Sequence, residues 1–387
     1  MWAWPMISLI TTNSMPCSNC ASTWRGSEKV ASRRSLLAVT GSVAAGFSIA
    51  ADSAKFNTFS EAHAASDAPR WVWVQEPAKY VRCIAIDAMP PVVSRSPVAL
   101  GQLMKGVGRA RVERVGVSVG LGSSFFSGVH ALRPRHLKSM PSFLGDLLDE
   151  SQTHGDALVY LESDSAADLG DAARRLLSVM PAWRQRWSIG GFRKENRAQG
   201  GKWLARNPFH FTEGFGNPDT EREVVDRAVV VPGQGEPAWA EGGSYQVIRI
   251  VRFATDLWDR DSVDEQERII GRRREGRWLD GTPGEEQPNF AADPHGKATP
   301  LDSHVRLAAP DRRNPPPMVR RSYSYDRGDG DSGLIFSCFQ RDLVQGFETV
   351  QHRLEGESLS KYVLTTGGGY FFVPPPGDGW TEAFVRP

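Results

Sequence analysis

One histidine and two adjacent arginines stand out in the segment Leu301–Tyr325, which reads LDSHVRLAAPDRRNPPPMVRRSYSY. The imidazole of His304 can bind a metal ion or transfer a proton near neutral pH. Arg320 and Arg321 follow after a proline-rich connection, and a guanidinium keeps its positive charge in proteins. A histidine of this kind is, on local sequence alone, more often a surface or satisfied core residue than a ligand. Residues 301–325 by themselves therefore leave both roles open.

A second segment, FHFTEGFGNP at residues 209–218, contains the acid Glu213 followed by Gly214 and Phe215. A carboxylate can act as a base when it lies within roughly 2.6–3.2 Å of the proton that it takes, or reaches that proton through one water. An arginine cannot be this base, but it can stabilise negative charge that develops when a bond breaks. The structural alternative is that Glu213 only caps the next turn.

Together these segments resemble the dye-decolourising peroxidases, a family of haem enzymes. Residues 333–354, GLIFSCFQRDLVQGFETVQHRL, and residues 367–380, GGGYFFVPPPGDGW, match further blocks of the family in the expected order. The resemblance implies that His304 is the proximal ligand of one haem b per chain and that Arg320 reaches the distal side. Glu213 stands where the family has an aspartate, and Phe215 stands where it has a threonine. Both positions are departures from the family pattern.

The resemblance also implies which residues surround the haem. Asp342 is expected to accept a hydrogen bond from the ring of His304, in preference to the nearer Asp302, because such a contact fixes the tautomer of a ligating histidine. Residues expected to contact the cofactor are Gly214, Phe215, Phe336 and Arg320. The haem propionates are expected to bind Arg321, Arg249 or Arg252, with Arg320 as a further alternative. Arg249 and Arg252 are three apart on a predicted strand and face opposite sides, so at most one of them faces the haem.

The order of predicted elements indicates an α+β fold made of two ferredoxin-like halves, each β-α-β-β-α-β, packed together. Strands are expected at residues 71–74, 80–88, 115–120, 157–161, 245–253 and 334–339, with a closing strand near 367–373. Helices are expected at residues 97–109, 166–179, 262–271 and 343–354. We predict an N-terminal half at 65–206 and a C-terminal half at 207–387 that carries the haem.

The first 64 residues are expected to be a twin-arginine export signal that is removed. Arg33 and Arg34 precede an uncharged run that extends to Ala51, and Ala62–Ala64 offers a small-residue cleavage site. This predicts a periplasmic or extracellular protein, and the uncharged run is too short for a membrane span. A disordered extension with a chance arginine pair is the alternative.

Composition excludes several classes of partner. The chain has 387 residues, 40% of them hydrophobic, and a formal net charge of +1, so neither a nucleic acid nor an anionic membrane surface is expected as a partner. Of the four cysteines, Cys17 and Cys20 form a CxxC in the expected leader, which is weak support for zinc. Cys83 and Cys338 lie in apolar runs and are expected to be buried free thiols in preference to a disulfide.

The resemblance implies a secreted peroxidase that reduces hydrogen peroxide and oxidises bulky aromatic or phenolic molecules by one-electron steps. Electrons can enter such an enzyme through surface aromatics, and Tyr323, Tyr325, Tyr362 and Trp380 are candidates for this. The alternative is that they belong to the core, where aromatic residues of this kind are found more often. The rival interpretation is a haem-binding protein that handles haem iron, related to iron uptake, with little peroxidase turnover. The altered loop at Glu213 favours this rival. Whether the chain forms a homo-oligomer stays open.

Overall fold

The structure is a computed structural model that describes residues 71–385 except for 113, 201 and 312–315. The predicted export signal, its Arg33–Arg34 pair and the Cys17–Cys20 motif lie outside the described residues. Within the described ranges, no helix is both long enough and apolar enough to cross a membrane.

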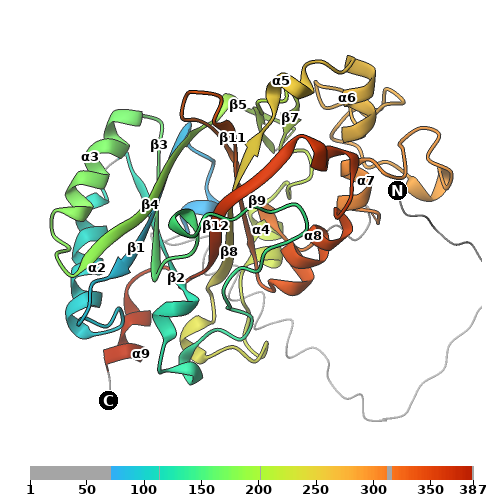
Figure 1. The fold of residues 1–387 in the computed structure, drawn as a ribbon. Coiled ribbons are helices and arrows are strands. Elements are labelled where there is room, and N and C mark those ends of the chain that lie inside the picture. Colours follow the sequence, from blue (N-terminus) through green and yellow to red (C-terminus); the bar gives the residue numbers. More distant parts are fainter. Residues whose placement is uncertain (1–70, 113, 201, 312–315, 386–387) are drawn as a thin grey trace, which may run out of the picture. The chain divides into compact units, whose positions relative to one another are not determined.

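Two halves of the same topology form the structure (Figure 1). The first half consists of β1 (Tyr80–Ala88), α2 (Pro97–Ala110), β2 (Gly116–Gly122), β3 (Ala157–Ser163), α3 (Ala166–Leu177) and β4 (Trp183–Phe192). The second half consists of β8 (Ser244–Phe253), α5 (Thr255–Trp258), α6 (Val263–Ile270), α7 (His304–Ala308), β9 (Val319–Arg320), β10 (Tyr323–Asp326), β11 (Ser332–Gln340), a π-helix at Val344–Glu348, α8 (Thr349–Arg353) and β12 (Val363–Val373). Both halves follow the β-α-β-β-α-β order, and the predicted fold is confirmed.

The two halves share one closed sheet. Its strand order is β10-β4-β1-β3-β2-β12-β8-β11-β9, and β10 also pairs with β11. Each half contributes four strands in the ferredoxin-like order, β4-β1-β3-β2 and β10-β11-β8-β12, and the seams between halves are short, with Ser324 opposite Phe192 at one of them. Closure removes the exposed sheet edges that would otherwise be left on each half.

Helix ends follow the local sequence. Ser96 and Ser165 cap α2 and α3 by accepting hydrogen bonds from Ala99 N and Asp168 N, and α6 ends at Gly271, whose φ of 87° is the left-handed conformation that glycine tolerates best. Two predictions were wrong in detail. Residues 72–74 form a 3-10 helix instead of a strand, and the helix expected at 343–354 is divided into a π-helix and α8.

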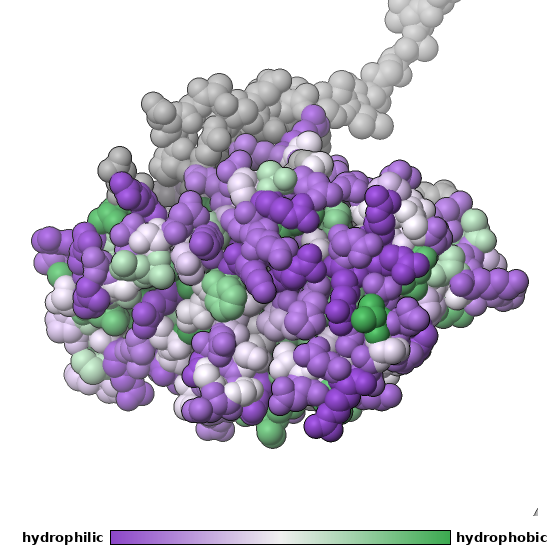
Figure 2. Space-filling view, turned by 90° about the horizontal axis from the view of Figure 1, so that it is seen from above, coloured by the Kyte–Doolittle hydropathy of each residue, from purple (hydrophilic) through white to green (hydrophobic). Residues whose placement is uncertain are grey.

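Apolar residues divide between the inside of the closed sheet and its two outer faces. The inside is filled by residues that include Cys83, Tyr160, Ile248 and Phe371. Helices α2 and α3 cover the outer face of the first half, whereas α7, α8 and long loops lie over the second half (Figure 1). Cys83 and Cys338 are buried free cysteines, as predicted. One face of the surface is mainly hydrophilic with scattered apolar residues (Figure 2).

A small second sheet joins the two halves. It consists of β5 (Lys194–Gln199), β6 (Lys202–Arg206) and β7 (Thr212–Glu213), in the order β5-β6-β7. Helix α4 (Glu221–Ala228) follows, and Thr220 caps it by accepting from Glu223 N. This sheet spans the predicted boundary at residues 206 and 207, and it places the 209–218 segment against the second half through the contact of Asn217 with Arg320. The boundary itself stays a prediction.

Candidate active site

His304 is the first residue of α7, and its ring is oriented by a carboxylate that sequence analysis missed. The His304 Nδ1 atom lies 2.9 Å from Glu357 Oε2 and 3.1 Å from Oε1. Because Nδ1 donates to the carboxylate, Nε2 is the nitrogen left for a metal. The His304 side chain is 32% exposed whereas that of Glu357 is 8% exposed, so the imidazole presents an open side and the acid behind it is buried.

Glu357 also adjusts the electrostatics of the imidazole. Burial lowers the pKa of His304, but the charge and hydrogen bond of Glu357 raise the pKa more, and the net pKa is above the usual value. A more basic imidazole is a better donor to iron. The pair therefore leaves Nε2 of a carboxylate-supported histidine available for a metal.

The prediction that Asp342 supports His304 was wrong. Its Oδ1 accepts hydrogen bonds from the backbone N–H of Val344 and Gln345, at 2.9 and 3.0 Å, and so caps the turn that begins the π-helix. Its other oxygen lies 3.7 Å from His136 Nε2. The alternative Asp302 pairs with Arg268 at 3.4 Å. Glu357 lies 53 residues after His304 in a loop, with no spacing that marks it in the sequence.

The segment that leads into α7 is anchored by Arg306. This buried arginine donates to Asp293 Oδ2 at 3.1 Å, to Thr299 O at 2.7 Å and to the backbone oxygens of Asp293 and Phe290. Ser303, at the helix start, donates to Pro300 O at 2.7 Å. These contacts fix the backbone on both sides of His304, which holds its ring in place.

Glu213 lies in β7, opposite Ala205 of β6, and its carboxylate is held at one oxygen. Asn207 Nδ2 donates to Glu213 Oε1 at 3.0 Å, and Asn207 also accepts from Phe211 N at 3.0 Å. Gly214 follows with a φ of 114°, and a Cβ there would lie 2.7 Å from Trp203 O. The turn after Glu213 therefore needs glycine. The alternative in which Glu213 caps a turn is not what the hydrogen bonds show.

Arg320 lies in β9 with its backbone clamped to the 209–218 segment. Asn217 Oδ1 accepts from Arg320 N at 2.9 Å, and Asn217 Nδ2 donates to Arg320 O at 2.7 Å. A Cβ at Gly216 would collide with the Arg320 guanidinium. Burial lowers the pKa of Arg320 and the charge of Glu213 acts in the opposite direction, so the guanidinium and the carboxylate interact. Glu213 also interacts electrostatically with His304.

Two other predicted haem contacts are engaged elsewhere. Arg321 points into the closed sheet, where it pairs with buried Glu162 at 2.6 Å and donates to Gln75 O at 2.6 Å. The prediction of Arg321 as a propionate ligand was therefore wrong. Arg249 is buried and pairs with Asp146 through both terminal nitrogens, so its charge is already neutralised. Its role as a propionate ligand has no support in these contacts.

The Phe215 ring packs against the loop that contains Gly276 and Gly284. An added Cβ at either glycine would collide with the ring, and the Arg272 guanidinium lies 5.1 Å from its centroid. The ring therefore anchors the 209–218 segment to this loop. Phe336 lies half-buried on β11, 6.0 Å from the ring of Phe347, on the same outer face as its strand partner Arg249.

The four aromatics named as surface electron-entry points are buried. Tyr323 and Tyr325 are each 1% exposed, Tyr362 is 8% exposed and Trp380 is 6% exposed. Tyr323 donates a hydrogen bond of 2.5 Å to Glu162 inside the closed sheet. The alternation along β10 puts Tyr323 and Tyr325 on the inner face, which made them core residues. The four residues therefore belong to the core, which is the alternative that the sequence left open, and they are not surface electron-entry points.

Comparison with known proteins identifies the family. The chain matches the models of the Dyp-type peroxidase N-terminal domain over residues 85–193 and C-terminal domain over residues 204–378. The chain belongs to the Dyp-type peroxidase family. A solved DyP-type peroxidase from Streptomyces coelicolor is 30% identical, with a TM-score of 0.71 over 80% of this chain and 92% of that chain. Ferric DtpA from Streptomyces lividans is also 30% identical, with a TM-score of 0.71 over 80% of this chain and 93% of that chain.

The curated relatives of this protein are named after an activity on haem. Proteins called deferrochelatase from Yersinia pseudotuberculosis and Escherichia coli are 39% and 38% identical over 67% of this chain. This chain covers 63% and 65% of their lengths, which is less than two thirds. A Rhodococcus jostii DypB variant in complex with heme shares the fold at 22% identity, with a TM-score of 0.62 over 80% of this chain and 95% of that chain.

Proposed function

We propose that this protein is a haem-dependent peroxidase that reduces hydrogen peroxide and oxidises aromatic molecules in one-electron steps. The observation that carries the proposal is the His304–Glu357 pair on α7, with Glu213 and Arg320 held on another wall of the site. Solved relatives include ferric and oxyferrous DtpA from Streptomyces lividans, and they support haem as the cofactor of this chain.

The residues present fit one haem b. The Nδ1 atom of His304 is occupied by Glu357 and its side chain is partly exposed, so Nε2 is available as an axial ligand. Phe336 offers an apolar surface on the adjacent outer face of β11. Bound haem would supply a redox-active iron at which peroxide is reduced. The propionate partners stay open because Arg321 and Arg249 are engaged by Glu162 and Asp146.

The protein's own groups would handle the protons and the charge. Asn207 holds Glu213 Oε1 and thereby orients the carboxylate, so Oε2 can take a proton from one oxygen of hydrogen peroxide and return it to the other. Arg320 keeps a fixed positive charge beside that oxygen pair, which stabilises negative charge as the O–O bond breaks. At His304, Glu357 accepts a hydrogen bond from Nδ1 and thereby keeps the imidazole oriented and basic.

Rapid mixing of the haem-loaded protein with hydrogen peroxide tests this proposal. Glu213→Gln keeps the size of the side chain but removes the base, and positioned acid–base groups contribute about 10²–10⁴-fold, so the peroxide reaction should slow by that factor. Asn207→Ala should slow the same reaction less, because the base remains but is no longer oriented. Glu213→Asp should retain the reaction, since it keeps a carboxylate in this place. Equal rates for the wild type and Glu213→Gln would refute the role of Glu213.

Handling of haem iron is the second proposal, because the curated relatives are called deferrochelatase. It is distinguished by turnover. A peroxidase should oxidise many aromatic molecules for each bound haem, whereas a haem-handling protein should load haem fully and show little steady-state turnover. Export by the twin-arginine route, which carries folded proteins, is a further proposal that suits either function.

A further inference from the structure

The outer edge of β9 is completed by a side chain instead of by another strand. On one side β9 pairs with β11, where Arg320 lies opposite Cys338. On the other side, the Arg320 backbone N–H donates to Asn217 Oδ1 at 2.9 Å, and Arg320 O accepts from Asn217 Nδ2 at 2.7 Å. One asparagine amide therefore supplies both hydrogen bonds that a neighbouring strand would otherwise form with Arg320.

Asparagine is the residue type that this edge requires. Its amide presents one acceptor and one donor on the same short side chain. An aspartate of the same shape would present two acceptors to the N–H and C=O of Arg320, and an alanine would present neither group. Loss of the Asn217 amide would leave two part-buried backbone groups of Arg320 without their partner.

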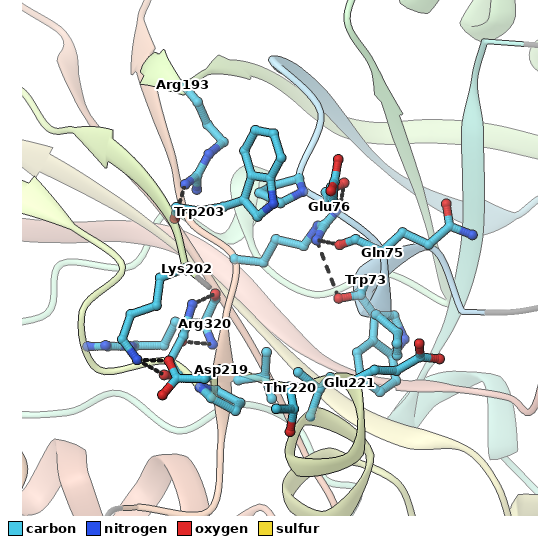
Figure 3. A pocket seen from close by; sticks show the side chains of 17 residues that line it. Trp73, Gln75, Glu76, Arg193, Lys202, Trp203, Asp219, Thr220, Glu221 and Arg320 are labelled. Atoms are coloured by element: carbon cyan, nitrogen blue, oxygen red, sulfur yellow. Dashed lines mark hydrogen bonds and ion pairs between the residues drawn. The ribbon is translucent and has the colours of Figure 1, made fainter. Parts of the chain in front are cut away.

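Asn217 is itself tied to β6. Buried Lys202, on this strand, donates to Asn217 O at 3.2 Å and pairs with Asp219, which fixes the turn that contains Asn217. Figure 3 shows the Lys202 amine at the Asp219 carboxylate, with Arg320 beside them. Strand β6 also pairs with β7, the strand that contains Glu213. One strand therefore holds the backbone of the acid and, through Asn217, the backbone of the arginine.

The charged end of Arg320 rests on Gly216. A Cβ added at Gly216 would collide with Arg320 Nη2 and lie 3.2 Å from Cζ. The φ of Gly216 lies outside the left-handed region, so an alanine there would displace the guanidinium without straining the backbone. Burial lowers the pKa of Arg320 and the charge of Glu213 raises it, so the guanidinium on Gly216 lies within electrostatic reach of the acid. Asn217 and Gly216 therefore act on opposite ends of one side chain.

We propose that Asn217 and Gly216 are positioning residues of the peroxide reaction, which together set the Arg320 guanidinium in its place beside Glu213. The inference rests on the proposed peroxidase function, in which Glu213 moves the proton and Arg320 stabilises the developing charge. Neither Asn217 nor Gly216 carries a charge or a titratable group, so each acts through Arg320. The small sheet then serves as the frame that fixes the arginine relative to the acid.

Rapid mixing of the haem-loaded variants with hydrogen peroxide tests the inference. Arg320→Leu should slow the peroxide reaction by about 10²–10³-fold, the usual loss on removal of one preorganised donor. Asn217→Ala and Gly216→Ala should each slow it by about 10–100-fold, because a displacement of about 1 Å can cost about 100-fold. Added to Arg320→Leu, either substitution should change the rate by less than about twofold, since no guanidinium is left to position.

The free energy of unfolding separates positioning from a merely structural role. Asn217→Ala should lower it by a similar amount with and without Arg320→Leu, because the backbone groups that lose their partner remain in both. Asn196→Ala is the matched control. Asn196 lies in the same small sheet, where its amide donates to Pro77 O at 2.8 Å and accepts from Arg193 Nε at 2.9 Å, without a contact to Arg320. Its loss should lower stability and leave the peroxide rate unchanged.

Fluoride binding to the ferric haem-loaded protein provides a readout that needs no turnover. Fluoride is an anion, so a guanidinium fixed beside it should stabilise the bound form. Arg320→Leu should weaken fluoride binding by about tenfold or more, the range of a hydrogen bond to a charged group. Asn217→Ala and Gly216→Ala should each weaken it by at least about threefold, because the guanidinium is present but displaced. Asn196→Ala should leave it unchanged.

The inference alone is overturned if Arg320→Leu slows the peroxide reaction while Asn217→Ala and Gly216→Ala react like the wild type. Full additivity of the rate losses in the double variants would overturn it too, because the two residues would then act independently of Arg320. Gly216→Ala keeps the test available even if Asn217→Ala does not fold. A wild-type rate in Arg320→Leu refutes the part of Arg320 in the proposed function, and the inference falls with it.

Discussion

Replacement of Glu357 should weaken haem binding although Glu357 contacts no haem atom in this account. Its carboxylate accepts from His304 Nδ1 at 2.9 Å and its side chain is only 8% exposed, so the hydrogen bond is charged and largely shielded from water. Hydrogen bonds to charged groups contribute about 1.5–3 kcal/mol and neutral ones about 0.5–1.5 kcal/mol. Glu357→Gln keeps a neutral acceptor, so the loss should be roughly 1–1.5 kcal/mol.

A loss of this size corresponds to about fivefold to tenfold weaker haem affinity. Glu357→Ala removes the acceptor altogether and should weaken affinity by about 10–100-fold, the usual range for groups that support a metal-ligating histidine. The assay is transfer of haem to an excess of apomyoglobin, followed by absorbance. Asp342→Asn is the matched control, because Asp342 caps a turn and does not contact His304. If Asp342→Asn weakens haem binding and Glu357→Gln does not, the assignment of Glu357 is wrong.

Two further predictions concern stability and export. Glu162→Gln leaves the guanidinium of Arg321, which is 5% exposed, without its carboxylate, so the free energy of unfolding should fall by about 3–5 kcal/mol in a denaturant titration. Asp331→Asn removes the charge of the partly exposed pair with Arg327 and keeps an oxygen that can accept from the Tyr325 hydroxyl, so it should cost less than about 1 kcal/mol; similar losses for both variants would contradict the argument. Arg33→Lys combined with Arg34→Lys should block export and leave folding intact, as measured by the exported fraction of the protein. Normal export of the double variant would exclude a twin-arginine signal.

The sequence was sufficient for the fold and for the segments that carry the site. Alternation of apolar and polar residues in the segments of β2 and β8 and the amphipathic pattern of the α3 segment are local signals, and local signals are what a sequence displays. The resemblance placed His304, Glu213 and Arg320 on segments that the structure brings together, with Arg320 clamped by Asn217 beside Glu213.

The failures involve contacts between segments distant in the sequence. Glu357 meets His304 across 53 residues, and Glu162 meets Arg321 across 159 residues, so neither partner could be chosen from spacing. Asp342 lies in a block that matches the family and is closer to His304 in the sequence than Glu357 is. Its carboxylate accepts hydrogen bonds from the backbone N–H groups of Val344 and Gln345 instead. Phe215 was expected to contact the cofactor, because the glycines against which its ring packs, Gly276 and Gly284, lie more than sixty residues away.

Ligation of haem iron by His304 is the central claim, and a haem titration of the purified protein followed by absorption spectroscopy tests it most directly. The wild type should bind one haem per chain and develop an intense Soret band with the ligand-field bands of a histidine-ligated ferric haem. His304→Ala should lose the Soret band or retain haem only weakly. A His304→Ala protein that binds one full equivalent of haem with an unchanged ligand-field spectrum would contradict the account.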